Sequence, residues 1–237
     1  MYVAYVAGLI CILMPCLTAP VFAVGTVSRI RKWNRAGASR IPLFPTPATS
    51  SGKWKRILTE TLTFGQLSNG NRSLWIGTWV FHLFLFMVLI GHTMLVADLT
   101  ALWKNPAFEN LWADPICVTI ARVAGLVLLA AAFYLFTRRF SSQRVREISG
   151  FGDYMSIALI LSVVISGDLM RFSPSFDRAA VCEFLSGLIS FKVTAVPRDP
   201  FFLLHLLFAQ VLVMYIPFSK FLHIPGVFYC KAALYRS

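Results

Sequence analysis

Four histidines are the residues of this chain whose type and spacing could do chemistry. They are His82, His92, His205 and His223, and each lies within or at the end of a long apolar run. Ionisable side chains are rare inside such runs, and those that occur there mark a functional site by default. Imidazole titrates near neutral pH and is the commonest metal ligand, so metal binding and proton transfer are the two chemistries to consider.

The composition predicts the elements that carry these histidines. Hydrophobic residues make up 57% of the 237 residues and charged residues 14%, whereas about a quarter of a soluble domain is charged. A helix of about 20 apolar residues crosses the hydrocarbon of a bilayer, and the chain has five such runs. We therefore predict an all-α membrane protein whose residues 1–237 form a single domain. Its five transmembrane helices are expected at residues 2–27, 74–97, 116–137, 154–170 and 201–222.

The basic residues predict the orientation of these helices, because Lys and Arg are retained on the cytoplasmic side. Sixteen of the 22 lie in a cytoplasmic loop at residues 28–73, after the third helix, or in the C-terminal tail. The N-terminus is therefore expected outside and the C-terminus in the cytoplasm. This arrangement explains the net charge of +12 without a nucleic-acid partner. The first run is too long for a signal peptide and has no basic residue before it, so we expect it to remain as the first helix.

The two long loops contain apolar stretches that predict short helices. In the cytoplasmic loop, an amphipathic stretch from Trp54 to Leu67 is expected to lie on the membrane lipid or against a partner. In the outer loop, residues 172–200, the stretch "VCEFLSGLISF" predicts a short interfacial helix. Asp168 and Arg171, at the outer end of the fourth helix, are expected to form an interfacial pair.

The motifs that this sequence lacks narrow the chemistry. Its five cysteines form no CxxC pair and have no zinc-ligand spacing, which disfavours a disulfide-forming enzyme and an iron–sulfur cluster held by this chain. Phosphate-binding loops, dinucleotide fingerprints and HExxH motifs are also absent. Any chemistry therefore depends on a bound cofactor or on polar groups within the membrane.

The spacing of the histidines indicates where they face. His82 and His92 are ten residues apart, about 15 Å of rise and about 80° around an ideal helix. His205 and His223 are eighteen residues apart, which is five whole turns and about 27 Å on one face. Pro217 lies between them and is expected to kink or end the fifth helix. The two helices therefore differ in the separation of their histidines. That kink, helix tilt and the slant of any ligand must account for this difference.

Topology predicts how the histidines pair. The second and fifth helices run in opposite directions, so His82 should face His223 near the cytoplasm and His92 should face His205 near the outer side. Two imidazoles at one depth are what a six-coordinate haem iron needs. We therefore expect two haems b between helices 2 and 5, with Gly91 allowing a flat macrocycle to approach the backbone.

Other interpretations of the four histidines remain open. An intramembrane histidine can simply form a hydrogen bond between helices. Four of them could form a proton or metal path in a polytopic transporter, although the acidic partners expected at mid-membrane are absent because the acids lie at helix ends. A purely structural membrane anchor is a third possibility.

Three segments resemble a known family. They are "FHLFLFMVLIGH", "TRRFSSQRVREISGFGD" and "HLLFAQVLVMYIPFSKFLHI", which are similar to segments of the gamma subunit of respiratory nitrate reductase, a dihaem membrane cytochrome b. The resemblance extends from about Leu74 to Ile224 and includes both histidine spacings. The longer, proline-containing first cytoplasmic loop favours the branch found in sulfite-reductase-linked or heterodisulfide-reductase-like complexes.

The resemblance implies a function for the chain. It implies the quinol-oxidising, or quinone-reducing, subunit of a multi-subunit oxidoreductase in a prokaryotic inner membrane. Electrons would pass between menaquinone or ubiquinone near the outer face and a cytoplasmic iron–sulfur subunit, which would be heterodisulfide-reductase-like or nitrate reductase beta-like. A partner subunit would act on the terminal substrate.

The resemblance also assigns residues. His82 and His223 would hold the inner haem, and His92 and His205 the outer one. The family's quinol-binding lysine has no match in "LWADPICVTIAR", so His92, Arg122 and Lys104 are the quinone-site candidates. Arg138 and Arg139 correspond to the family's basic pair, and with Arg122 they are candidates for contact with haem propionates.

Overall fold

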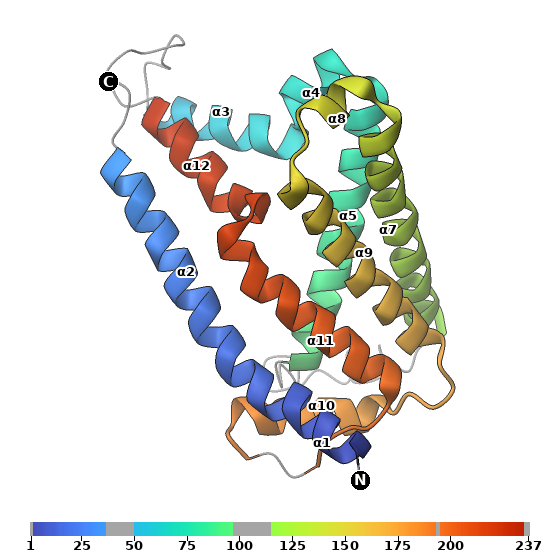
Figure 1. Ribbon diagram of the computed structural model, residues 1–237. Helices are drawn as coiled ribbons and strands as arrows, with labels where there is room; N and C mark the ends of the chain where they lie inside the picture. The colour runs from blue at the N-terminus through green and yellow to red at the C-terminus, as the bar shows by residue number, and fades with distance from the viewer. Residues whose placement is uncertain (1, 37–49, 97–114, 193–194, 235–237) are drawn as a thin grey trace.

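The computed structural model describes residues 2–36, 50–96, 115–192 and 195–234. Within these ranges the fold is helical, with no strand. Five helical stretches are long and apolar enough to cross a membrane: residues 4–35, 72–93, 115–141, 151–172 and 200–218. The five predicted spans are therefore confirmed as helices, and they lie side by side along the long dimension of the molecule in Figure 1.

The first span consists of α1 (Tyr2–Gly8), a π-helical turn η1 (Leu9–Leu13) and α2 (Met14–Ala36). A π turn leaves the backbone bonding irregular, and the structure supplies a side-chain partner at this point. The Nε2 of Gln210, on α11, donates to the carbonyl of Ile10 at 3.0 Å, and Thr18 Oγ1 lies 3.5 Å from Gln210 Oε1. The buried amide therefore joins the first span to the fifth.

The rest of the described chain consists of further long helices and of short elements at their ends. The long helices are α5 (Arg72–Val96), α7 (Pro115–Ser141) and α9 (Phe151–Phe172). Helix α5 packs on α7, α7 packs on α9, and α9 also packs on α11 (Pro200–Tyr215). Short elements complete the ends: α3 (Ser50–Thr63), α4 (Gly65–Gly70), α8 (Gln143–Glu147), α10 (Arg178–Ile189) and α12 (His223–Leu234).

Figure 1 shows that the short elements lie at two opposite ends of the bundle. Helices α3, α4, α8 and α12 lie at one end, which we name the α3 end. Helices α1 and α10 lie at the other, which we name the α10 end. The predicted outer-loop helix is confirmed as α10, whose N-cap Asp177 accepts a hydrogen bond from the Ala180 amide at 3.1 Å.

Two clusters of buried apolar residues hold the bundle. One joins α1, η1, α10 and α11 at the α10 end and includes Cys11, Phe184 and Phe202. The other joins α5, α7 and α9 and includes Phe81, Leu128 and Leu161. The long helices α5 and α11, which carry three of the four histidines, are therefore anchored in different clusters, α11 in the first and α5 in the second.

Candidate functional site

The structure brings the four histidines together in two pairs. The ring centroids of His82 and His223 are 6.1 Å apart, and those of His92 and His205 are 5.9 Å apart. These are the pairs that the topology predicts. His82 and His223 form the α3-end pair, and His92 and His205 form the α10-end pair.

The Nδ1 atom of each histidine lies beside a backbone carbonyl. On α5, His82 Nδ1 is 2.8 Å from the Thr78 carbonyl and His92 Nδ1 is 2.7 Å from the Val88 carbonyl. A carbonyl only accepts, so this contact assigns the ring proton to Nδ1 and leaves the Nε2 lone pair available. Metal-binding histidines are commonly fixed in this way.

His205 is held by α9 rather than by its own helix. Its Nδ1 lies 3.0 Å from the Val163 carbonyl and 3.3 Å from Ser166 Oγ. A Cβ added to Gly167 would lie only 3.0 Å from His205 Cε1, so a larger residue here would require the ring or α9 to shift by a few tenths of an ångström. The backbone and two small residues of α9 therefore determine where this imidazole lies.

His223 lies on a different element from the one expected. Helix α11 ends at Tyr215, two 3-10 turns follow at Ile216–Phe218 and Lys220–Leu222, and α12 begins at His223. Pro217 ends the helix, as predicted, because its ring and missing N–H interrupt helical bonding. The expectation that His205 and His223 share one face of one helix is therefore wrong. The break brings His223 to His82 although a straight helix would separate His205 and His223 by about 27 Å.

The spacing of each pair suits two imidazoles that would hold one haem iron. No group of three or more His, Cys, Asp or Glu side chains in the described part of the chain could hold a metal ion. A porphyrin supplies four ligands itself and needs only two from the protein. Metal–imidazole bonds of about 2 Å on both sides would place the ring centroids about 6 Å apart, close to both observed separations.

Comparison with known proteins adds an independent finding. The model of the nitrate reductase gamma subunit family matches residues 51–235. The chain belongs to that family. It is 28% identical to an Hdr-like menaquinol oxidoreductase cytochrome b-like subunit of Archaeoglobus fulgidus, over 92% of this chain and 76% of the relative.

Two further family relatives differ in how much they share. The chain is 24% identical to the Hdr-like menaquinol oxidoreductase cytochrome b-like subunit of Archaeoglobus profundus, over 91% of this chain and 75% of the relative. It is 22% identical to the nitrate reductase gamma chain of Bacillus subtilis, over 62% of this chain and 70% of the relative. The similarity to the Hdr-like subunits therefore covers more of this family member.

The predicted basic residues of this gamma-family chain lie in different surroundings. Arg138 Nε is buried without a hydrogen-bond partner, whereas Arg139 Nη1 donates to Ser149 Oγ at 3.0 Å. The guanidinium carbon of Arg122 lies 5.7 Å from the centre of the Phe172 ring. Lys104 lies outside the described residues. Among the predicted basic residues that the structure describes, Arg138 alone has a buried donor atom without a hydrogen-bond partner, which an added anionic group would satisfy.

Gly91 and the Asp168–Arg171 pair complete the predicted positions. Apart from its chain neighbours and its own helix backbone, a Cβ at Gly91 would meet no atom of the described chain within 4 Å, so this position faces open space. Asp168 and Arg171 do not form the predicted ion pair. Arg171 Nη1 instead donates to the Ala121 carbonyl, and Asp168, with a side-chain oxygen against Gly125 of α7, is buried with Oδ2 unpaired.

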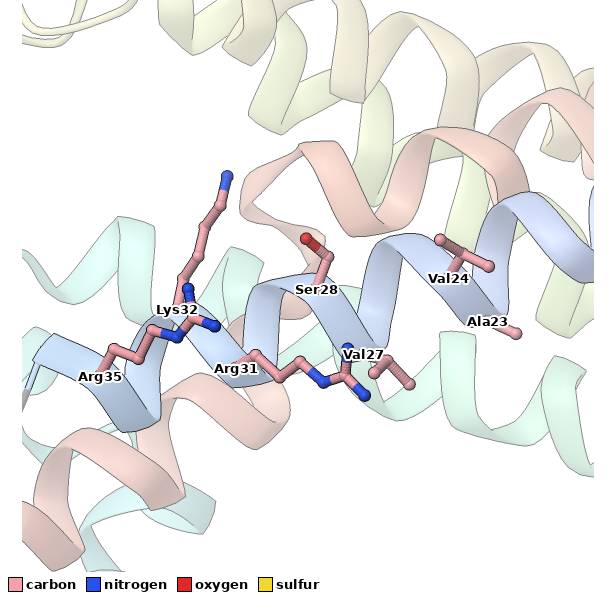
Figure 2. A pocket seen from close by; sticks show the side chains of 7 residues that line it. All are labelled: Ala23, Val24, Val27, Ser28, Arg31, Lys32 and Arg35. Atoms are coloured by element: carbon pink, nitrogen blue, oxygen red, sulfur yellow. The ribbon is translucent and has the colours of Figure 1, made fainter.

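The open cavity in Figure 2 lies along α2, and no histidine lines it. Its volume is about 580 Å³, and its lining runs from Ala23 and Val24 to Arg31 and Arg35, all on one helix. It contains none of the residues predicted to be functional. The cavity therefore does not belong to the histidine site.

Sequence reasoning missed three residues around the histidines. Ser166 and Gly167 contact His205, and the ring of Phe64 lies 5.0 Å from that of His82. Phe64 was predicted only as part of the amphipathic stretch from Trp54 to Leu67, which the structure divides into α3 and α4 at Phe64 itself. No spacing signal in one sequence connects residues so distant along the chain.

Proposed function

We propose that this chain is the membrane cytochrome b subunit of a respiratory redox complex. It carries electrons through two bis-histidine haems b, one at each histidine pair. The observation that carries the proposal is that two histidine pairs face one another at two levels of one bundle, each ring with Nδ1 at a hydrogen-bond acceptor. A transporter path would need titratable groups connecting these levels.

The relatives and the charge distribution support an orientation of the chain in the membrane and a location for the quinone and the partner subunit. Two relatives are named as menaquinol oxidoreductase subunits, which favours menaquinone as the quinone. The α3 end carries the basic loops, so we assign it to the cytoplasm and place the N-terminus outside. The α10-end pair then lies near the quinone, with His92, Arg122 and Lys104 as its candidate residues. The α3-end pair then lies near a cytoplasmic iron–sulfur partner, as the Hdr-like names favour.

In this proposal the residues of the chain bind the haems and orient the histidine rings. Haem supplies the one-electron redox chemistry when bound, and two imidazole ligands leave no open position for oxygen. Carbonyls at Thr78, Val88 and Val163 keep the ring protons on Nδ1. In this proposal the unpaired Nε of Arg138 would bind a haem propionate at the α3 end, and Gly91, which faces open space, would let a macrocycle approach the backbone at the α10 end.

A haem count tests the proposal. The purified protein should show a reduced-minus-oxidised spectrum of low-spin haem b, with about two haems per chain as two bis-histidine sites require. Adding menaquinol to membranes should reduce both haems. A chain without haem would contradict the proposal and favour the transporter, and one haem per chain would contradict the assignment of a haem to each pair.

A further inference from the structure

The junction between α3 and α4 places a phenylalanine against the α3-end pair. Phe64 has φ 49° and ψ 39°, the left-handed region that L-residues with large side chains rarely adopt. Glycine is the residue that adopts this conformation without a steric cost. A phenylalanine here is therefore held in an unfavourable conformation by its surroundings.

Two tryptophans of α5 hold this junction. The Trp75 Nε1 and Trp79 Nε1 atoms donate to the carbonyl of Thr63, at 2.8 and 3.3 Å. The ring of Trp79 also meets that of Phe64 edge to face, with centroids 5.9 Å apart. The amides of Leu67 and Ser68 bond back to the Phe64 carbonyl, at 2.8 and 3.4 Å. The backbone of Phe64 is thus fixed on both sides.

The ring that this backbone directs lies on His82. The centroids of Phe64 and His82 are 5.0 Å apart, and their planes are tilted by 42°. The planes of His82 and His223 are perpendicular, at 90°, whereas those of His92 and His205 differ by only 31°. Phe81 also meets the His82 ring edge to face, with centroids 5.2 Å apart, whereas in the described part of the chain the rings of His92 and His205 have an aromatic contact only with each other. Phe64 is therefore a feature of one pair alone.

Helix α3 also connects the two halves of this pair. Its Ile57 is fully buried, and the helix packs against α12, which begins at His223. Its far end leads through Phe64 to His82 on α5. Figure 1 shows α3 extending across the end of the bundle between α12 and α4. One short helix therefore contacts the elements of both histidines.

We infer that Phe64 is a positioning residue for the α3-end histidines: its ring, held by the α3–α4 junction, sets the plane of His82. The inference rests on the proposed function, because its consequence is measured on a haem. The low-spin EPR signal of a ferric bis-imidazole haem depends on the angle between the ligand planes. Its midpoint potential depends on the apolar shell around the site.

Phe64→Gly distinguishes the effect of the ring from that of the backbone conformation. Glycine adopts the left-handed conformation, so only the ring is lost. In the purified complex we expect one of two haem EPR signals to move and its midpoint potential to fall, because water stabilises the oxidised, more charged form. The other haem should keep its wild-type values. Phe64→Tyr retains the ring and should restore both. Phe64→Leu provides a second ring deletion if the glycine variant does not accumulate.

Phe140→Ala is the matched control. Phe140 lies at the same end and pairs with Phe136 and Tyr154, with centroids 5.0 and 5.1 Å apart, but it contacts no histidine. This variant should leave both haems unchanged. Two haems with wild-type signals in Phe64→Gly and Phe64→Leu would overturn the inference alone. A wild-type protein without haem would instead overturn the proposed function on which it rests.

Discussion

The two histidine pairs have similar ring separations but are built from different parts of the fold. At the α10 end, His92 and His205 lie within long helices, and α9 fixes His205 through Val163, Ser166 and Gly167. At the α3 end, His223 begins a short helix after two 3-10 turns, and Phe64 reaches His82 from a surface junction. One pair is a product of span packing, and the other depends on short elements at the end of the bundle.

This difference indicates how each pair responds to change. The α10-end pair is embedded in helix–helix contacts, so altering it also alters the packing of α9 on α11. His223 is exposed, and its Nδ1 contact is with the Lys220 carbonyl, three residues away and 3.2 Å distant. Under the proposed function, a substitution in the α3-end pair should therefore remove its haem with less damage to the fold than one in the α10-end pair.

The largest expected contrast is between His205→Ala and His223→Ala. Each should lower the haem content from about two to about one per chain under the proposed function. His205→Ala also removes the contact with Val163 and Ser166, and interhelical hydrogen bonds in membranes contribute about 0.6 to 1.7 kcal/mol. It should therefore lower the melting temperature more than His223→Ala does. Pyridine haemochrome assay and thermal unfolding in detergent measure the two effects. Equal melting temperatures would contradict the comparison.

Gly167→Ala should affect one pair without removing a ligand. The added Cβ would lie 3.0 Å from His205 Cε1 and 3.2 Å from Nδ1, so the imidazole or α9 must move. Overpacking of this kind costs roughly 1 to 3 kcal/mol. We expect a changed EPR signal for one haem and an unchanged one for the other. Gly8→Ala is the control, since its Cβ meets nothing within 4 Å. An unchanged Gly167→Ala spectrum would show that His205 is positioned by its own helix.

Lys220→Met should have the smallest effect of these substitutions on stability, and it should act at the α3-end pair. Lys220 Nζ pairs with Asp153 at 2.9 Å and joins the turn before His223 to the start of α9. Its side chain is 79% exposed, so the pair contributes at most about 1 kcal/mol. We expect a small fall in melting temperature together with a weaker α3-end haem signal. Arg56→Met, which removes an exposed pair within α3 to Glu60, should leave the signal unchanged.

Much of the fold could be predicted because it follows from hydrocarbon thickness and helix periodicity. The second span was expected at residues 74–97 and is observed as Arg72–Val96. The fourth was expected at residues 154–170 and begins earlier, at Phe151, because Asp153 accepts the Gly150 amide at 3.1 Å and lies in the first turn. The pairing of the histidines followed from alternating helix direction alone.

The parts that could not be predicted depend on contacts between distant residues. A helix period places His205 and His223 on one face, and Pro217 predicts a break between them, but the sequence does not show that two 3-10 turns and a new helix at His223 follow that break. The closeness of Asp168 and Arg171 in sequence suggested a pair, but the Ala121 carbonyl on α7 accepts from the arginine instead. The left-handed Phe64 has no sequence signal, because glycine is the residue expected in that conformation.

The long sequence separation within each pair has a consequence for assembly in the cell. The partners are about 140 and about 110 residues apart in the chain, so neither site exists until the last span has been synthesised, roughly ten seconds after the second at typical translation rates. The second span must therefore wait in the membrane with two unliganded imidazoles. Under the proposed function, haem is captured only after both histidine-bearing regions have been made, and a ribosome stalled before α11 should yield an inserted chain that binds no haem.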